Sequence, residues 1–271
     1  MGYFSMFMSI AMVIGPACGL YLWKDKNITL LLVTVCVIAA LSLLFTLGIR
    51  VRQPKQGNTK MTLNVEPVKR KKGMHWSDFI EPKALPISLV GFLLAVSYSS
   101  LSGFMASFTT EIHQSQVAGI FFVAFAIMIV LFRPLVGKVF DKYNEHYLCY
   151  PGILLFTVGM FLLSQADSGT MVLVAGFIMG AGYGALFSSF QALAILLSPE
   201  NRRGSANATF FLLFDSGYGV GSYFMGLIAS FTDYRMMYVF AGAIAMLSAG
   251  LYYGLHHRTR AKQTIQNQNA M

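Results

Sequence analysis

One carboxylate of this chain lies inside a long apolar run. Asp215 stands about ten residues into the run 206–231, which corresponds to about 15 Å along a helix. If the run crosses a bilayer, a charge at that depth costs at least about 2.5–3.5 kcal/mol, so the side chain must face protein or water. Such a carboxylate could take up and release a proton, which makes Asp215 a candidate for proton coupling. The alternative is a structural carboxyl capped by hydroxyls such as that of Ser216.

Two other apolar runs place aromatic and polar side chains on one helical face. A spacing of four residues aligns Tyr98 with Ser102, and it aligns Tyr183 with Phe187 and Gln191. A wall of Tyr and Phe with few charges suits flat, apolar or cationic solutes better than sugars, which need several amide and carboxylate partners. The alternative is ordinary packing between helices. These five residues are therefore candidates for the lining of a substrate cavity.

Spanning helices must position these residues. The 271 residues are 56% hydrophobic and 11% charged, whereas soluble domains are about 45–50% apolar and about 25% charged. This composition excludes a water-soluble enzyme and a disordered chain. Because about 20 apolar residues cross a bilayer, the sequence predicts an all-α polytopic membrane protein with eight spans. They are 3–23, 28–49, 84–109, 117–137, 148–165, 170–197, 206–231 and 235–255.

The basic residues are distributed very unequally between the two sides of this topology. Seventeen of the 20 Lys and Arg lie on one side, and only Lys24, Lys26 and Arg235 lie on the other. The positive-inside rule then makes both termini and the long connection 50–83 cytoplasmic. The run 69–72 within that connection could alternatively bind anionic lipid or nucleic acid. The net charge of +9 is thus interpreted as a signal of topology, and no nucleic-acid partner is expected.

Several motifs resemble those of the major facilitator superfamily. The segment 133–143, RPLVGKVFDKY, resembles the cytoplasmic loop signature of that family, and it contains Arg133, Gly137, Asp141 and Lys142. The segment 198–206, running into the glycines that follow Asp215, resembles the family's eleventh helix. The segment 15–19, GPACG, resembles the fifth-helix motif of its drug and proton antiporters and supplies Gly15, Pro16 and Gly19.

The resemblance implies a particular architecture. The eight spans match helices five to twelve of a twelve-helix transporter, so the first four helices are expected to be missing from this chain. Residues 1–49 would then be the last two helices of the N-terminal bundle, 50–83 the basic linker, 84–255 the C-terminal six-helix bundle and 256–271 a cytoplasmic tail. The residues matching Gly137 and Asp141 help to close the cytoplasmic side in the family, and Arg133 is expected to have a structural role. A solvated loop turn is the alternative.

The resemblance also implies a function. A proton-coupled exporter of hydrophobic or amphipathic compounds is expected in the cell membrane, with the bilayer, a small-molecule substrate and any upstream helices as its partners. Uptake of a small nutrient is the alternative within transport, and a truncated, inactive or non-transporting protein is the alternative outside it. No nucleophile elbow, HExxH or P-loop motif is present, so an enzyme is not expected. No cofactor is expected beyond a proton gradient, and the three cysteines lack the spacing of a metal site.

Overall fold

The computed structural model describes residues 11, 14, 15, 18, 19, 21, 22, 28–48, 80–142 and 145–257. The chain divides into two compact units, of which one is Leu22–His75 and the other combines Met1–Tyr21 with Trp76–Met271. Most of the predicted span 3–23 lies outside the described residues. Of the predicted linker 50–83, residues 50–79 lie outside them. The predicted division of the chain into 1–49, 50–83, 84–255 and 256–271 stays a prediction.

The smaller unit contains one long helix, α2 (Ile28–Gly48). Its 21 residues extend about 32 Å, which is enough to cross a hydrocarbon core. Two threonine hydroxyls of this helix are satisfied within it, since Thr34 and Thr46 donate to the carbonyls of Leu30 and Ser42, each at 2.8 Å. A helix that is apolar all round and bonded internally is the form that lipid requires. The predicted span 28–49 is therefore confirmed as a helix to within one residue.

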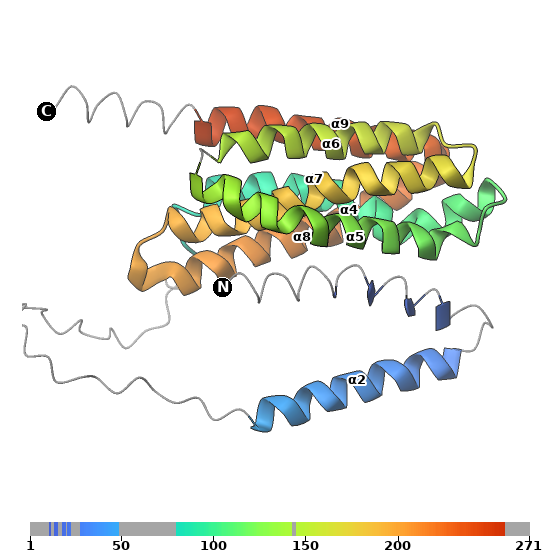
Figure 1. The fold of residues 1–271 in the computed structure, drawn as a ribbon, viewed down its shortest axis with the longest axis horizontal. Coiled ribbons are helices and arrows are strands. Elements are labelled where there is room, and N and C mark those ends of the chain that lie inside the picture. Colours follow the sequence, from blue (N-terminus) through green and yellow to red (C-terminus); the bar gives the residue numbers. More distant parts are fainter. Residues whose placement is uncertain are drawn as a thin grey trace, which may run out of the picture. The chain divides into compact units, whose positions relative to one another are not determined.

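The larger unit is a bundle of six long helices in alternating directions (Figure 1). Each forms at a predicted run, and short polar turns separate most of them. Within residues 80–142 and 145–257, every regular element is helical. The helices are α4 (Leu85–Glu111), α5 (Val117–Lys142), α6 (His146–Ser164), α7 (Gly169–Leu196), α8 (Arg203–Phe231) and α9 (Tyr234–Tyr252), with a short turn η1 (Glu200–Arg202) before α8 and a π-helical turn η2 (Tyr253–His257) at the end.

Six helices of the described residues are long and apolar enough to cross a membrane: α2, α4, α5, α6, α7 and α9. The helix α8 is 29 residues long but is not among the six, because Asn207, Asp215 and its many Gly and Ser residues lower its hydropathy. It nevertheless packs against α4, α7 and α9 within the bundle (Figure 1). A long helix that is only moderately apolar is expected where protein or water, rather than lipid, covers part of its surface.

Glycines allow the helices of the bundle to approach closely. On α7, a Cβ at Gly180 would lie 2.5 Å from the carbonyl oxygen of Phe125 in α5, and one at Gly182 would lie 2.6 Å from the carbonyl oxygen of Gly152 in α6. On α8, a Cβ at Gly217 would lie 2.5 Å from the carbonyl oxygen of Phe92 in α4. Small residues at helix contacts are the usual means of tight association in lipid, and here they bring α7 against two neighbours and α8 against α4.

Candidate functional site

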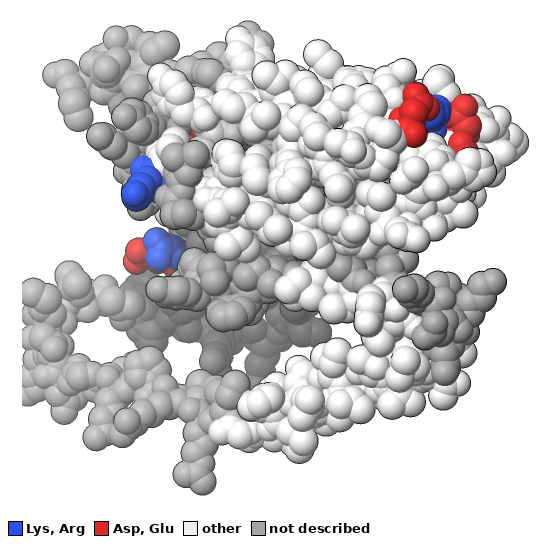
Figure 2. All heavy atoms as spheres, turned by 45° about the vertical axis from the view of Figure 1, so that its right-hand side comes forward, with Lys and Arg blue, Asp and Glu red and all other residues white. Residues whose placement is uncertain are grey.

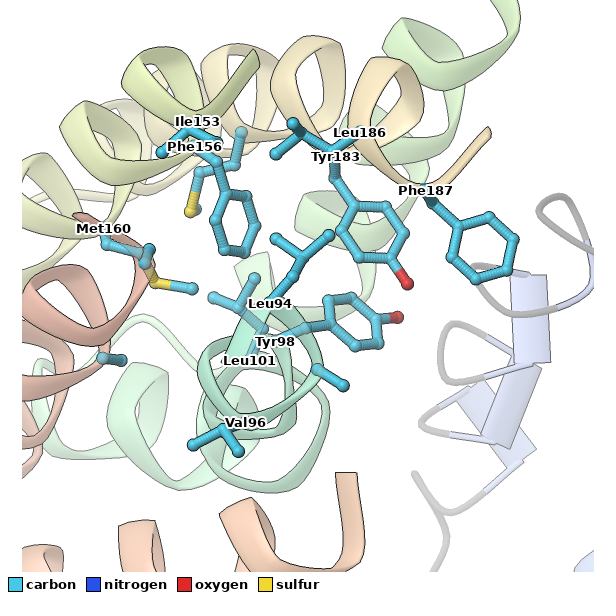
Figure 3. Packing of buried hydrophobic residues seen from close by; sticks show 14 of the residues in the cluster. Leu94, Val96, Tyr98, Leu101, Ile153, Phe156, Met160, Tyr183, Leu186 and Phe187 are labelled. Carbon is cyan, nitrogen blue, oxygen red and sulfur yellow. The ribbon is translucent and has the colours of Figure 1, made fainter. Parts of the chain in front are cut away.

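Two buried tyrosines from different helices form the centre of the candidate site. Tyr98 of α4 stacks on Tyr183 of α7 with ring centroids 4.5 Å apart and an angle of 24° between the planes. Both residues are at most 2% exposed. Their hydroxyls point the same way, away from the apolar core around Ile153 and Met160, and Phe187 lies on that side as well (Figure 3). The structure therefore brings together three of the five predicted cavity residues.

The helix α8 completes this cluster with aromatic residues that the sequence analysis missed. Phe187 contacts Phe214 edge to face at 5.1 Å, and it stacks on Tyr183 at 5.9 Å. The hydroxyls of Ser102 and Tyr218 share a hydrogen bond of 2.6 Å, which joins α4 to α8. Phe210, Phe214 and Tyr218 recur every four residues on the helix that carries Asp215. That spacing is the signal by which they could have been found.

The hydroxyl of Tyr183 is buried and has no hydrogen-bond partner among the described residues. A buried hydroxyl without a partner costs free energy, of the order of 1–3 kcal/mol. An arriving ligand that accepts or donates a hydrogen bond would recover part of this cost. The hydroxyl of Tyr238 is also buried and without a partner, but it belongs to α9, where its ring packs edge to face on Phe108 at 5.1 Å.

Asp215 is the thirteenth residue of α8, about 18 Å along the helix from its first residue. It is exposed on the surface of the described bundle, and it directly follows Phe214, whose ring contacts Phe187 of the cluster at 5.1 Å. The Ser216 hydroxyl donates to the carbonyl of Leu212 at 2.6 Å, so its only proton is not directed to the carboxylate. Asp215 thus borders the aromatic cluster, and Ser216 does not cap it.

Gln191 lies two turns beyond Tyr183 on α7 and takes part in a different contact. Its amide nitrogen donates to the Asn207 side-chain oxygen of α8 at 3.1 Å, and the residue is only 5% exposed. A buried amide pair of this kind satisfies polar groups that lipid could not. The structure therefore separates Gln191 from the tyrosine pair with which its spacing aligns it.

The residues of the loop signature lie on a helix. The predicted fourth span ends at residue 137, but α5 continues to Lys142, because residues 135–142 contain one glycine and no proline to end it. Gly137 is exposed, and a Cβ there would meet nothing within 4 Å. The side chains of Arg133, Asp141 and Lys142 lie outside the described part, so their closing role stays a prediction.

The antiporter-type motif is described only in part. Gly15 and Gly19 have helical backbone, whereas Pro16 lies outside the described residues. Among the residues that the structure describes, no three His, Cys, Asp or Glu side chains come together as a metal would require. On the face shown in Figure 2, the charged side chains gather near the ends of the bundle and leave its middle uncharged. That distribution is the one expected of helices that cross a bilayer.

The helices, the aromatic cluster and the charge distribution define a polytopic membrane protein with a polar site between helices. The family model of the Major Facilitator Superfamily matches residues 1–222 and, in a second match, residues 87–270. The chain therefore belongs to this superfamily, as the motifs predict. Since its members are transporters, the prediction that the chain is not an enzyme is confirmed.

Similar proteins include a multidrug efflux pump, a quinolone resistance protein and an uncharacterized MFS-type transporter. The multidrug efflux pump SdrM of Staphylococcus aureus is 26% identical over 107 residues, 40% of this chain and 24% of that protein. An uncharacterized MFS-type transporter of Salmonella typhimurium is 25% identical over 245 residues, 90% of this chain and 58% of that protein. The quinolone resistance protein NorA of S. aureus is 23% identical over 146 residues, 54% of this chain and 37% of that protein. The chain thus spans between about a quarter and three fifths of the length of these relatives.

Proposed function

We propose that this protein is a proton-coupled exporter of hydrophobic or amphipathic small molecules. The observation that carries the proposal is the stacked pair of Tyr98 and Tyr183, whose Tyr183 hydroxyl has no partner among the described residues, together with the exposed carboxylate of Asp215 on the neighbouring helix α8. Two of the similar proteins bear the names multidrug efflux pump and quinolone resistance protein. Their names favour export over uptake.

The chemistry of the cluster suits flat, weakly polar molecules. Tyrosine and phenylalanine rings offer large apolar faces that stack on planar solutes, and their negative faces attract organic cations. The hydroxyls of Ser102 and Tyr218 are already bonded to each other at 2.6 Å, whereas the buried Tyr183 hydroxyl has no partner among the described residues and can still bond to a ligand. A sugar would need more polar partners than this cluster supplies.

Asp215 is proposed to couple export to the proton gradient. It is a carboxylate about 18 Å into a helix, exposed on the bundle, and it directly follows Phe214 of the proposed binding cluster. Protonation would remove a negative charge where a cationic or polar substrate binds, so that proton and substrate affect each other's affinity. No further cofactor is needed for this cycle.

We further propose that the protein resides in the cell membrane with its C-terminus in the cytoplasm. The support is the segregation of 17 of the 20 basic residues to one side of the predicted topology. The predicted linker 50–83 and tail 256–271 would lie on that side, and any further helices of the polypeptide would complete the substrate path.

The test is the transport of ethidium, a lipophilic cation, by everted membrane vesicles from cells that express the protein from its native reading frame. A proton gradient should drive ethidium into these vesicles. Asp215→Asn should abolish the response to the gradient, and Tyr183→Ala should raise the KM for ethidium. Tyr238→Phe is the matched control, because it removes a buried, partnerless hydroxyl outside the cluster, and it should transport as the wild type does.

Three results would contradict the proposal. Wild-type vesicles that accumulate no ethidium would favour the non-transporting alternative. Vesicles that leave ethidium untouched, in a strain that loses uptake of a nutrient on deletion of the gene, would favour uptake. Unchanged transport and unchanged pH dependence in Asp215→Asn would remove the coupling role from this carboxylate.

A further inference from the structure

A set of polar contacts joins the segment before α4 to the start of α8. The Arg202 guanidinium pairs with the Glu81 carboxylate at 2.5 Å and donates to the Ile80 carbonyl at 2.9 Å. The backbone N–H of Glu81 donates to the Thr209 hydroxyl at 2.9 Å. We refer to Ile80, Glu81, Arg202 and Thr209 as the α4–α8 clasp. It joins residues that are more than 120 positions apart in the sequence.

Two residues of the clasp, one before α4 and one on α8, are shielded from water. Glu81 is 3% exposed and Thr209 is 1% exposed. The second carboxylate oxygen of Glu81 accepts a hydrogen bond from the backbone N–H of Lys83 at 3.3 Å, which orders the turn that leads into α4. Two hydrogen bonds cross between the segments, from Arg202 to the Ile80 carbonyl and from the Glu81 N–H to Thr209. Because hydrogen bonds are directional, each of these two fixes the position of one segment along the other.

Beyond the clasp, α4 and α8 run in the same direction along one close seam (Figure 1). A Cβ at Gly217 would lie 2.5 Å from the Phe92 carbonyl oxygen, and a Cβ at Gly221 would lie 2.6 Å from the Val96 Cα. Packing of this kind is non-directional, so it resists separation of the helices more than sliding of one along the other. The Ser102–Tyr218 hydroxyl pair lies further along the same seam.

We infer that the α4–α8 clasp sets the axial register of α4 against α8. Glu81 and Arg202 are then positioning residues, which act through the two helices and touch no substrate. The register decides whether the Ser102 and Tyr218 hydroxyls meet, and it sets the position of Asp215 relative to Tyr98. Its effect on substrate rests on the proposed function, whereas the register itself does not.

Hydrogen exchange measured by mass spectrometry on the purified full chain in detergent tests the register. Arg202→Gln should increase exchange by at least about tenfold, both at the clasp and in peptides that cover Ser102 and Tyr218. The exchanged pair Glu81→Arg with Arg202→Glu should restore protection at both places. Asp167→Asn is the matched control, since it breaks an ion pair at the other end of the bundle, and it should leave exchange along the seam unchanged.

The second readout is ethidium transport in vesicles with equal amounts of protein. Arg202→Gln should raise the KM by at least about threefold, because the site is displaced while the protein stays folded. If the wild type moves no ethidium, the proposed function fails, but the exchange measurement still decides the register. If the exchanged pair does not fold, Arg202→Lys should show exchange between that of the wild type and that of Arg202→Gln. Increased exchange confined to residues 80–84 and 200–209, with the Ser102 and Tyr218 peptides unchanged, would overturn the inference.

Discussion

An ion pair between an arginine and a carboxylate lies at each end of the helical bundle, and the two ion pairs differ in burial. At the end where α4 begins, Arg202 pairs with Glu81, and the two side chains are 32% and 4% exposed. At the other end, Arg235 of α9 pairs with Asp167 of the α6–α7 turn, and the two side chains are 33% and 82% exposed. The two arginines are almost equally exposed, so the two pairs differ mainly in the burial of the carboxylate.

The difference in carboxylate burial predicts which contacts contribute most to the stability of the bundle. Taking one partner from a buried pair leaves an uncompensated charge out of water, whereas an exposed carboxylate is resolvated at little cost. At the exposed end, most of the stabilisation should come from backbone bonds, because Arg235 also donates to the carbonyls of Ser164 and Ala166 at 3.4 and 3.2 Å. Four substitutions test this ordering by the thermal unfolding of purified protein in one detergent.

Arg202→Ala should have the largest effect. It leaves the Glu81 carboxylate buried without its cation and the Ile80 carbonyl without its donor, at a cost of about 3–5 kcal/mol. The melting temperature should fall by more than in any of the other three variants. A fall no larger than that of Asp167→Asn would show that water reaches Glu81, and the comparison would then fail.

Thr209→Val should come next. The substitution keeps the shape of the side chain but removes the oxygen that accepts the Glu81 N–H at 2.9 Å. A buried N–H without an acceptor costs about 1–3 kcal/mol. Thr209→Ser keeps the hydroxyl and serves as the control. Equal melting temperatures for the valine and serine variants would show that the hydrogen bond contributes nothing.

Arg235→Ala should have an intermediate effect, of about 1–2 kcal/mol, because its loss frees two backbone carbonyls at the other end of the bundle. Arg235→Lys keeps the charge but not the planar group that reaches both carbonyls and Asp167. The lysine variant should therefore melt closer to the alanine variant than to the wild type. Wild-type stability of the lysine variant would mean that charge alone matters at this end.

Asp167→Asn should have the smallest effect, at most about 1 kcal/mol, because the side chain is mostly in solvent. The difference from the wild type should shrink further in high salt, which screens exposed charges. The Arg202→Ala difference should change much less with salt. A salt-independent loss in Asp167→Asn would contradict the interpretation of this pair as a solvated one.

Most of the helix positions could be predicted from the sequence. The runs 84–109 and 170–197 correspond to α4 (Leu85–Glu111) and α7 (Gly169–Leu196), because about 20 apolar residues in a row have few other stable forms. The end of α5 was not predicted correctly, since the loop signature after residue 137 continues as helix to Lys142. Sequence patterns place helix ends less well than helix interiors, because a glycine or a charge only weakly opposes another turn.

The candidate site was accessible in part. Spacing of four residues identified Tyr183 and Phe187 as one face of α7, and the structure stacks them at 5.9 Å. The spacing did not indicate that the Gln191 amide donates a hydrogen bond to Asn207 of α8. The spacing of four residues on α8 could have indicated Tyr218, but its hydrogen bond to Ser102 joins positions 116 apart, and no local period predicts such a pair.

The amino-acid sequence by itself determined that this chain is a polytopic membrane protein and where most of its helices form. Apolar length and the placement of charge are properties of each segment alone, and the bilayer acts on them directly. Only the tertiary structure decided that Glu81, which its position assigns to the basic linker 50–83, is buried against Arg202 and Thr209. It also decided that the Tyr183 hydroxyl is buried and, within the part of the chain that the structure describes, has no hydrogen-bond partner. Burial and partnership depend on which distant segments meet, and that is settled by the packing of the whole bundle.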